Sequence, residues 1–236
     1  YLVNSRKFTL YISDLTKDYR EYYLLLDEIQ LLDNFVFALN GLLNHDNFDI
    51  YVTGSNSKML SKDVITEFRG RGDQIHVYPL SFKEYYESSN LSFEDAYLDY
   101  QYYGGMPYLI NLNGEERKQE YLKQLFSEIY IKDITDRNGI KDIESFEKLL
   151  CVLSSSIGSY TNPTNLEKTF KSVENIVYGH VAIKNHIEYI KDAFLISEAK
   201  RYDIKGRKYI GSNSKYYFTD IGLRNALINF RQSEPT

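Results

Sequence analysis

The sequence predicts an α/β fold: part of a parallel sheet, then an α-helical region, then a C-terminal domain of helices with a β-hairpin. Three observations predict it. Short apolar runs alternate with helix-like segments over residues 1–87. Helical periodicity dominates from Ser81 onward. Two strand-like runs near the C-terminus are separated by a polar loop. We expect domains at 1–87, 88–140 and 141–236.

Two buried strands are expected in the first domain. The apolar run 22–27 ends in two acids and suits a strand buried on both faces of a parallel sheet. A helix over 31–43 leads to a second strand at 49–53. A third strand is expected at 74–78, directly before Pro79.

The remaining domains are predicted from helical spacing and breakers. The Gly104-Gly105-Met106-Pro107 segment breaks the helical series, and Thr219 with Asp220 caps the last helix. The expected helices are 82–86, 93–103, 115–134, 143–155, 165–170, 181–192 and 222–230, and the expected hairpin strands are 195–202 and 208–218.

Composition narrows the function classes. The 236 residues are 43% hydrophobic and carry a net charge of −5, so bulk electrostatics does not favour a polyanion partner. The single cysteine, Cys151, excludes an internal disulfide and a multi-cysteine metal site. We find no apolar run of about 18 residues and no leader segment, so we expect a cytoplasmic protein without a membrane partner.

Two acids, Asp27 and Glu28, follow the first strand directly. In a P-loop ATPase, the first such carboxylate orients Mg²⁺ through its water shell and the second polarises the attacking water. These acids must stand at the carboxyl end of a parallel strand, where such sheets bind ligands. An apolar run ending in two acids also arises by chance.

Polar residues follow the second strand, and arginines follow later. Thr53, Ser55 or Asn56 would stand where ATPases of this class sense the γ-phosphate, although Ser55 or Asn56 would equally cap a helix. Arg69 or Arg71 would act as a finger that stabilises transition-state charge, often across a subunit boundary. A solvated basic loop is the alternative for both arginines.

Together these segments carry a resemblance. The run Leu-Leu-Leu-Asp-Glu-Ile-Gln at 24–30, then Thr-Gly-Ser at 53–55, Gly-Arg at 70–71 and Val-Tyr-Pro-Leu-Ser-Phe-Lys-Glu at 77–84 resembles a prokaryotic AAA-type ATPase family. Residues 104–107 and 215–225 resemble its later segments. Members pair a P-loop-NTPase-like core with a helical and winged-helix region, so the resemblance covers nearly the whole chain.

The resemblance implies roles for individual residues. Asp27 and Glu28 would be the Walker B acids, with Asp27 holding Mg²⁺ through water. Ser55 would be the sensor, with Thr53 and Asn56 as rivals, and Arg71 is preferred over Arg69 as the finger. The implied cofactors are ATP and Mg²⁺, and a finger in trans implies a homo-oligomer.

The sequence departs from the family at two places. Members begin with a Gly-x-x-x-x-Gly-Lys-Ser/Thr loop that cradles the phosphates, and residues 1–236 contain none. Members also usually continue into a nuclease-like domain, and we expect none within residues 1–236. We therefore expect a fragment that by itself neither binds nor hydrolyses ATP well.

The order helix, helix and two-stranded wing over 164–218 predicts a winged-helix domain. In DNA-binding versions the second helix enters the major groove and the wing touches phosphate. The helix would present Lys184, Asn185, His186, Glu188 and Lys191 outward, and the acid Glu188 argues against entry into the groove. The wing would present a basic tip made of Lys200, Arg201, Lys205, Arg207 and Lys208. The leading hypothesis is an ATPase whose complete form uses nucleotide to switch or assemble, with the winged helix as its output module. The alternative is a winged-helix protein that binds DNA or another protein and whose P-loop-like half is structural and nucleotide-free.

Overall fold

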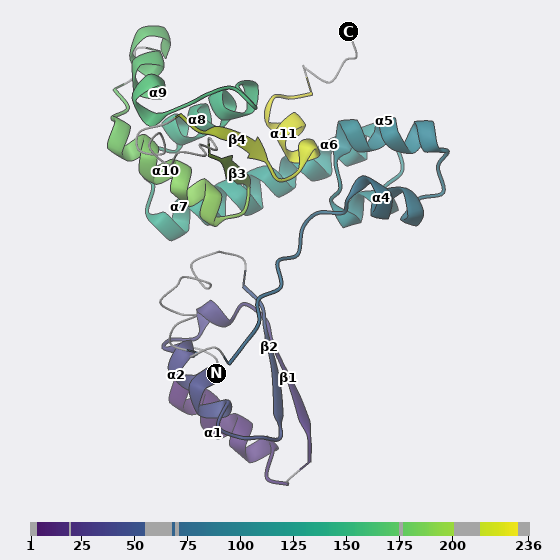
Figure 1. Ribbon diagram of the computed structural model, residues 1–236, viewed down its shortest axis with the longest axis vertical. Helices are drawn as coiled ribbons and strands as arrows, with labels where there is room; N and C mark the ends of the chain where they lie inside the picture. The colour runs from purple at the N-terminus through teal and green to yellow at the C-terminus, as the bar shows by residue number, and fades with distance from the viewer. Residues whose placement is uncertain are drawn as a thin grey trace, which may run out of the picture. The chain divides into compact units, whose positions relative to one another are not determined.

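The computed structural model describes residues 4–18, 20–54, 68, 71–174, 177–200 and 213–230 (Figure 1). The chain divides into two compact units, Tyr1–His76 and Val77–Thr236. Within the described ranges, no helix is both long enough and apolar enough to cross a membrane.

The first unit is a small α/β structure. Its elements are α1 (Ser5–Leu15), β1 (Tyr22–Leu26), η1 (Ile29–Leu31), α2 (Phe35–Leu42) and β2 (Phe48–Val52). Strands β1 and β2 pair in parallel, with Leu26 opposite Val52. Both strands and the parallel sheet were predicted and are confirmed. The helix expected over 31–43 begins later, at Phe35, because Asn34 before it has a left-handed backbone (φ 52°).

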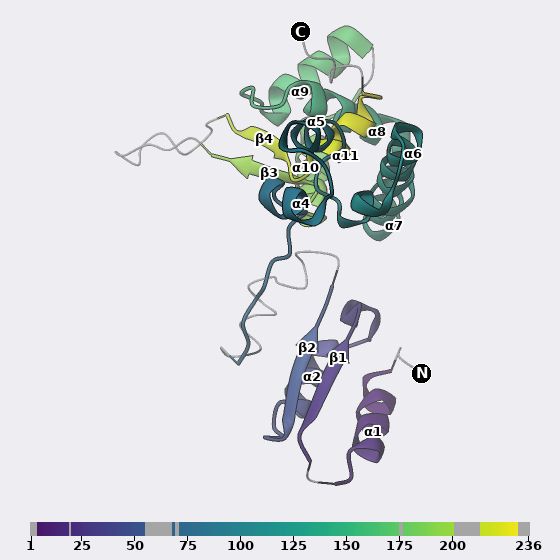
Figure 2. The same cartoon turned by 90° about the vertical axis from the view of Figure 1, so that its right-hand side faces the viewer.

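The two helices of this unit cover one face of the sheet. Helices α1 and α2 lie on the same side of the strands, to their left in Figure 1, and α2 lies behind the strands in Figure 2. Leu24 packs into a small core with residues of α1, η1 and α2. Leu25, which points the other way, is 75% exposed. The prediction of a strand buried on both faces was therefore wrong, because the described helices cover only one face.

No strand forms at 74–78, where a third one was predicted. The described residues 71–80 have no regular structure, and Ile75 is 84% exposed. Ile75 and Val77 alternate with polar residues and favour a strand, but a strand also needs a neighbouring strand with which to pair. Among the described residues, β1 and β2 pair only with each other.

The second unit is mostly helical. Its elements are α4 (Phe82–Ser88), α5 (Phe93–Tyr103), η3 (Pro107–Asn111), α6 (Glu115–Gln124), η4 (Leu125–Ile131), α7 (Lys132–Asn138), α8 (Ile143–Ser155), α9 (Pro163–Thr169), η5 (Phe170–Glu174), α10 (His180–Asp192), β3 (Ile196–Ala199), β4 (Lys215–Phe218) and α11 (Ile221–Leu227). The helices predicted at 93–103 and 143–155 have these bounds in the structure.

Other predicted elements of this unit differ in extent. The helix expected over 115–134 runs on to Asn138 as α6, η4 and α7, with a π-helical stretch in the middle. Strands β3 and β4 are antiparallel, as expected of a hairpin, with Ile196 opposite Phe218. Both are shorter than predicted within the described range, and residues 201–212 lie outside it.

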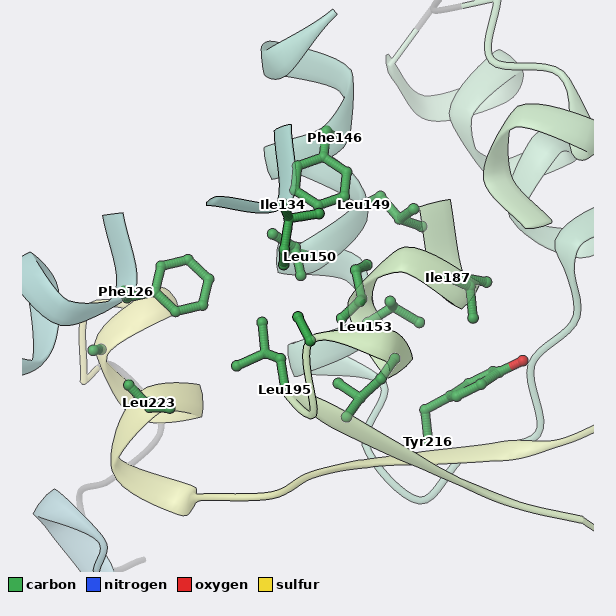
Figure 3. Close-up of a cluster of buried hydrophobic side chains, with 14 of the residues drawn as sticks. Phe126, Ile134, Phe146, Leu149, Leu150, Leu153, Ile187, Leu195, Tyr216 and Leu223 are labelled. Carbon is green, nitrogen blue, oxygen red and sulfur yellow. The ribbon is translucent and has the colours of Figure 1, made fainter. Parts of the chain in front are cut away.

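One core holds the second unit together (Figure 3). Helix α8 presents four buried apolar residues at helical spacing, Phe146, Leu149, Leu150 and Leu153. They meet residues from α7, α10, both strands and α11, including Ile134, Ile187, Leu195, Tyr216 and Leu223. Residues from both 88–140 and 141–236 share this core. The predicted division into those two domains stays a prediction.

Candidate functional site

The acid pair stands where the sheet ends. Asp27 and Glu28 follow β1, and Thr53 follows the neighbouring parallel strand β2. The Thr53 N–H donates to the Leu26 carbonyl at 2.9 Å, and the Ile29 N–H donates to the Thr53 carbonyl at 3.2 Å. The parallel pairing therefore continues past the strands and holds these residues together at the carboxyl edge, where open α/β sheets bind ligands.

The Thr53 side chain joins the two acids. Its hydroxyl donates a hydrogen bond to Oδ1 of Asp27 and accepts one from the Glu28 N–H at 3.2 Å. Thr53 was one of three rivals for the sensor position. Ser55 and Asn56, the other two, lie outside the described residues, as does Arg69. Thr53, the one described residue of the three, lies against the acid pair.

Glu28 has an unusual backbone. Its φ of 49° and ψ of 48° are left-handed, a conformation that non-glycine residues seldom adopt and that clusters at functional sites. This turn sends the chain from β1 directly into η1, where Ile29 is buried in the core. The Glu28 side chain is therefore held close to the sheet edge rather than carried away on a longer loop.

Gln30 is a residue whose role the sequence did not suggest. Its Nε2 donates a hydrogen bond to Oε2 of the Glu28 carboxylate. Gln30 belongs to the run Leu-Leu-Leu-Asp-Glu-Ile-Gln, so the signal was present, although nothing in the sequence assigned it a contact. It fixes the carboxylate that the sequence predicts to polarise water.

Arg71, the predicted finger, lies against helix α2. Its guanidinium donates to Oδ1 of Asn40 at 2.7 Å and of Asn44 at 3.4 Å, and its Nε donates to the Phe68 carbonyl at 3.4 Å. Asn40 and Asn44 lie at the end of α2 that leads into the start of β2. Because α2 runs back from the acid edge, this end lies toward the amino-terminal ends of the parallel strands.

The donor set suits Mg²⁺ only in part. Asp27 and Thr53 are exposed and offer oxygen atoms, which Mg²⁺ prefers, and Mg²⁺ commonly uses one or two carboxylates and keeps its remaining waters. Across the described part of the chain, no group of three or more His, Cys, Asp or Glu side chains could hold a metal. The phosphate-cradling loop is not among residues 1–236.

A second cluster joins two segments that the sequence singled out. The buried carboxylate of Asp220 caps α11 through the Leu223 N–H at 2.9 Å and accepts the Gly105 N–H at 2.7 Å. Burial raises the pKa of Asp220, while the N–H donors of Gly105, Leu223 and Gly222 lower it in part. The cap on α11 was predicted, but its contact with Gly105 was not, because 115 residues separate the two.

Glycines make this contact close. A Cβ on Gly222 would lie 1.8 Å from the Tyr103 carbonyl oxygen, and one on Gly104 would lie 2.4 Å from Oδ1 of Asp220. Asn225 adds two hydrogen bonds of 3.0 Å to the carbonyls of Gln101 and Tyr102. The segment 219–225 is therefore locked onto the end of α5. We call these contacts the Asp220 lock.

Helix α10 presents fewer groups than predicted. Lys184 and Asn185 are exposed, as expected. Lys191 is partly buried and paired with Glu198 at 2.7 Å and Glu188 at 3.0 Å. His186 is half-buried and hydrogen-bonded through Nδ1 to the Tyr178 hydroxyl, so both were wrongly expected to point outward. Lys205, Arg207 and Lys208 lie outside the described residues.

Comparisons with known proteins cover both units. A family model described as AAA domain matches residues 2–86, and one described as Domain of unknown function (DUF8612) matches residues 94–234. The first match supports an AAA-type P-loop origin for the unit that carries the acid pair.

Two curated relatives match along most of the chain. An uncharacterized protein of Haemophilus influenzae is 34% identical over 211 residues, which are 87% of this chain and 52% of that protein. An uncharacterized protein of Methanocaldococcus jannaschii is 29% identical over 225 residues, 89% of this chain and 49% of that protein. The chain spans about half the length of these curated relatives.

Proposed function

We propose that this chain, which belongs to the family described as Domain of unknown function (DUF8612), is part of an AAA-type ATPase in which Asp27 and Glu28 are the Walker B acids. The observation that carries the proposal is the Thr53 hydroxyl. It bonds to both residues at the carboxyl edge of two parallel strands. A chance apolar run ending in two acids has no reason to be joined in this way to the next strand.

Each residue has one task in this proposal. Asp27, oriented by Thr53, holds a water of the Mg²⁺ shell. Glu28, fixed by Gln30 and by its left-handed backbone, accepts a hydrogen bond from the attacking water and polarises it. When bound, ATP would supply the phosphoryl group and Mg²⁺ would neutralise its negative charge. Arg71, bound to α2 in this chain, acts on the site of a neighbouring copy if it is the finger.

The phosphate cradle is required for this activity. Backbone N–H groups and a lysine of a Gly-rich loop hold the β- and γ-phosphates in such enzymes. Residues 1–236 do not supply that loop, so we expect this stretch alone to bind ATP weakly and to turn it over poorly.

We further propose that residues 141–236, within the second unit, form a winged-helix output module. Helices α9 and α10 precede the antiparallel pair β3 and β4, in the order such domains follow. Exposed Lys184 and Asn185 on α10 favour contact with DNA, with Lys205, Arg207 and Lys208 in the connection between the strands. The alternative is a module for protein interaction, with the first unit purely structural.

ATP hydrolysis tests the leading proposal. In the protein as the cell makes it, Glu28→Gln should lower Mg²⁺-dependent turnover by about 10²–10⁴-fold while nucleotide binding remains. Glu21→Gln is the matched control, since Glu21 is an exposed acid directly before β1, at the opposite end of the strand. Equal turnover by the wild-type protein and Glu28→Gln would contradict the proposal and favour the structural alternative.

A gel shift at several salt concentrations tests the DNA proposal. Changing Lys184 and Arg207 to Ala should weaken binding to any duplex and reduce the slope of log affinity against log salt by about 1 for each lost phosphate contact. Lys83→Ala, on α4, is the control. Identical slopes of log affinity against log salt for all variants would contradict the DNA-binding proposal and favour a protein partner.

A further inference from the structure

The hairpin of α4 and α5 carries an exposed aromatic cluster. Phe82 meets Phe93 and Tyr97 edge-on, each with ring centroids 5.4 Å apart. Tyr86 meets Phe93 at 5.6 Å and lies stacked on Phe82. Phe93 is 53% exposed and Tyr97 is 46% exposed. We call Phe82, Tyr86, Phe93 and Tyr97 the aromatic face.

Packing of α4 and α5 into the second unit does not explain why these four rings cluster at the surface. The same two helices bury Tyr85, Ala96 and Tyr103 on another side, so their packing requirement is already met there. Rings that pack on one another and still face water form a contiguous apolar patch. Such patches mark binding surfaces, and Tyr and Phe are enriched in the centres of protein interfaces.

The charge around the aromatic face is negative. Helices α4 and α5 contain one basic residue, Lys83, and five acidic ones, Glu84, Glu87, Glu94, Asp95 and Asp99. Lys118 pairs with Asp99 at 2.5 Å, and Lys83 reaches Glu87 at only 3.8 Å. Glu87 and Glu94 are exposed on the same two helices that carry the rings, so the exposed surface of this hairpin has a net negative charge.

This charge decides which partner fits. Nucleic acid and an anionic lipid surface would both be repelled by it. A second copy docking through the same face would bring two acidic surfaces together, because a two-fold interface uses the same patch on both subunits. A positively charged protein segment is attracted both by the carboxylates and by the faces of the rings.

We propose that the aromatic face docks a basic, arginine-containing segment of a partner protein. Guanidinium groups lie over the exposed rings of Phe93 and Tyr97 and pair with Glu87 and Glu94. The chain already uses this chemistry internally, with Lys118 Nζ 5.2 Å from the Tyr103 ring centroid and Lys215 Nζ 4.9 Å from that of Tyr160. Neither nucleotide nor DNA takes part.

A labelled peptide of alternating Arg and Gly tests the proposal by fluorescence anisotropy against the full chain. Wild-type protein should bind it, and more weakly as salt rises. The double change of Phe93 and Tyr97 to Ala should weaken binding about tenfold. Glu87→Lys with Glu94→Lys, at solvent-exposed positions, should weaken it without touching the rings. Tyr217→Ala, an exposed tyrosine of β4, should bind as the wild type does.

Three results would overturn the proposal. The first is binding to the peptide that none of the face variants changes, and the second is no binding by the wild-type chain. The third is self-association in sedimentation that is lost in the Phe93 and Tyr97 variant, since this would assign the face to a second copy. Circular dichroism on each variant separates a lost surface from a lost fold.

Discussion

The two units of the chain differ in how they use their polar side chains. The first places polar groups at a sheet edge, where the Thr53 hydroxyl bonds to the Asp27 carboxylate and to the Glu28 N–H, and where Asp27 and Thr53 are exposed and Glu28 is partly buried. The second unit buries the carboxylate of Asp220 and surrounds it with backbone N–H donors from two segments that are distant in sequence. An exposed, oriented carboxylate can serve a ligand, whereas a buried and saturated one fixes a fold.

This difference predicts how each unit answers mutation. Side chains in the Asp220 lock have no room to move, so changes there should cost stability and leave chemistry alone. Changes at the acid edge should cost activity and leave stability nearly unchanged. The predictions below run from the largest expected effect to the smallest.

The same substitution at two glycines gives the sharpest contrast. Gly222→Ala puts a Cβ 1.8 Å from the Tyr103 carbonyl and should destabilise the second unit by about 3 kcal/mol through overpacking. Gly41→Ala, inside α2 with nothing within 4 Å of the new atom, should stabilise the first unit by about 0.5–1 kcal/mol. Urea unfolding followed by circular dichroism, with hydrogen exchange to locate the change, measures both. Effects of the same sign would break the comparison.

Removing two different helix caps compares the stabilisation from the Asp220 lock with that from an ordinary cap. Asp220→Ala leaves the N–H groups of Gly105 and Leu223 buried without their acceptor and should cost about 2–3 kcal/mol. Asp142→Ala removes the exposed cap of α8, whose recorded hydrogen bonds are both with Ser145 of the same helix, and should cost about 1 kcal/mol. Denaturant midpoints compare them directly, and equal losses would show that the contact with Gly105 contributes nothing.

His186 makes the stability of the second unit depend on pH. Burial lowers the pKa of His186 below its ordinary value of 6.5, although nearby Asp142 raises it in part. The fold therefore favours the neutral ring. The stabilisation is complete above pH 6.5 and is lost as the pH falls from there toward the lower pKa of the folded state. Between pH 7.5 and pH 5, the melting temperature should fall by more in the wild-type protein than in His186→Gln. Parallel curves would contradict this assignment.

The exposed sheet face gives the smallest effect. Leu25→Ser, at a residue 75% exposed in β1, should change the stability of this chain by no more than about 0.5 kcal/mol. Leu24→Ala, one position along and facing the small core, should cost about 2 kcal/mol. Urea unfolding measures both, and a large loss at Leu25 would mean that its face is covered in solution.

Local signals were enough to predict most elements. Apolar runs located β1 and β2, and helical spacing located α5, α8 and α10, because short-range periodicity fixes which face is buried. The run at 74–78 alternates Ile75 and Val77 with polar residues, as a strand would, yet no strand forms there. Its outcome depends on a pairing neighbour, which the composition of the run does not contain.

The sequence predicted where the site residues lie but not all of the hydrogen bonds that they make. Asp27, Glu28 and Thr53 came from their place after two strands, since parallel strands bring their carboxyl ends to one edge. The hydrogen bond from Gln30 to Glu28 and the one from Gly105 to Asp220 depend on a backbone turn and on tertiary packing. Spacing along the sequence contains neither.

Nucleotide binding with and without Mg²⁺ tests the central claim, that Asp27 is the acid that holds the ion. A fluorescent ATP analogue is titrated into the protein as the cell makes it, alongside Asp27→Asn and, as control, Asp49→Asn near the amino end of β2. The account predicts that Mg²⁺ strengthens binding by the wild type and the control, and that Asp27→Asn loses about 10- to 100-fold of that gain. Equal Mg²⁺ dependence in all three proteins would contradict it.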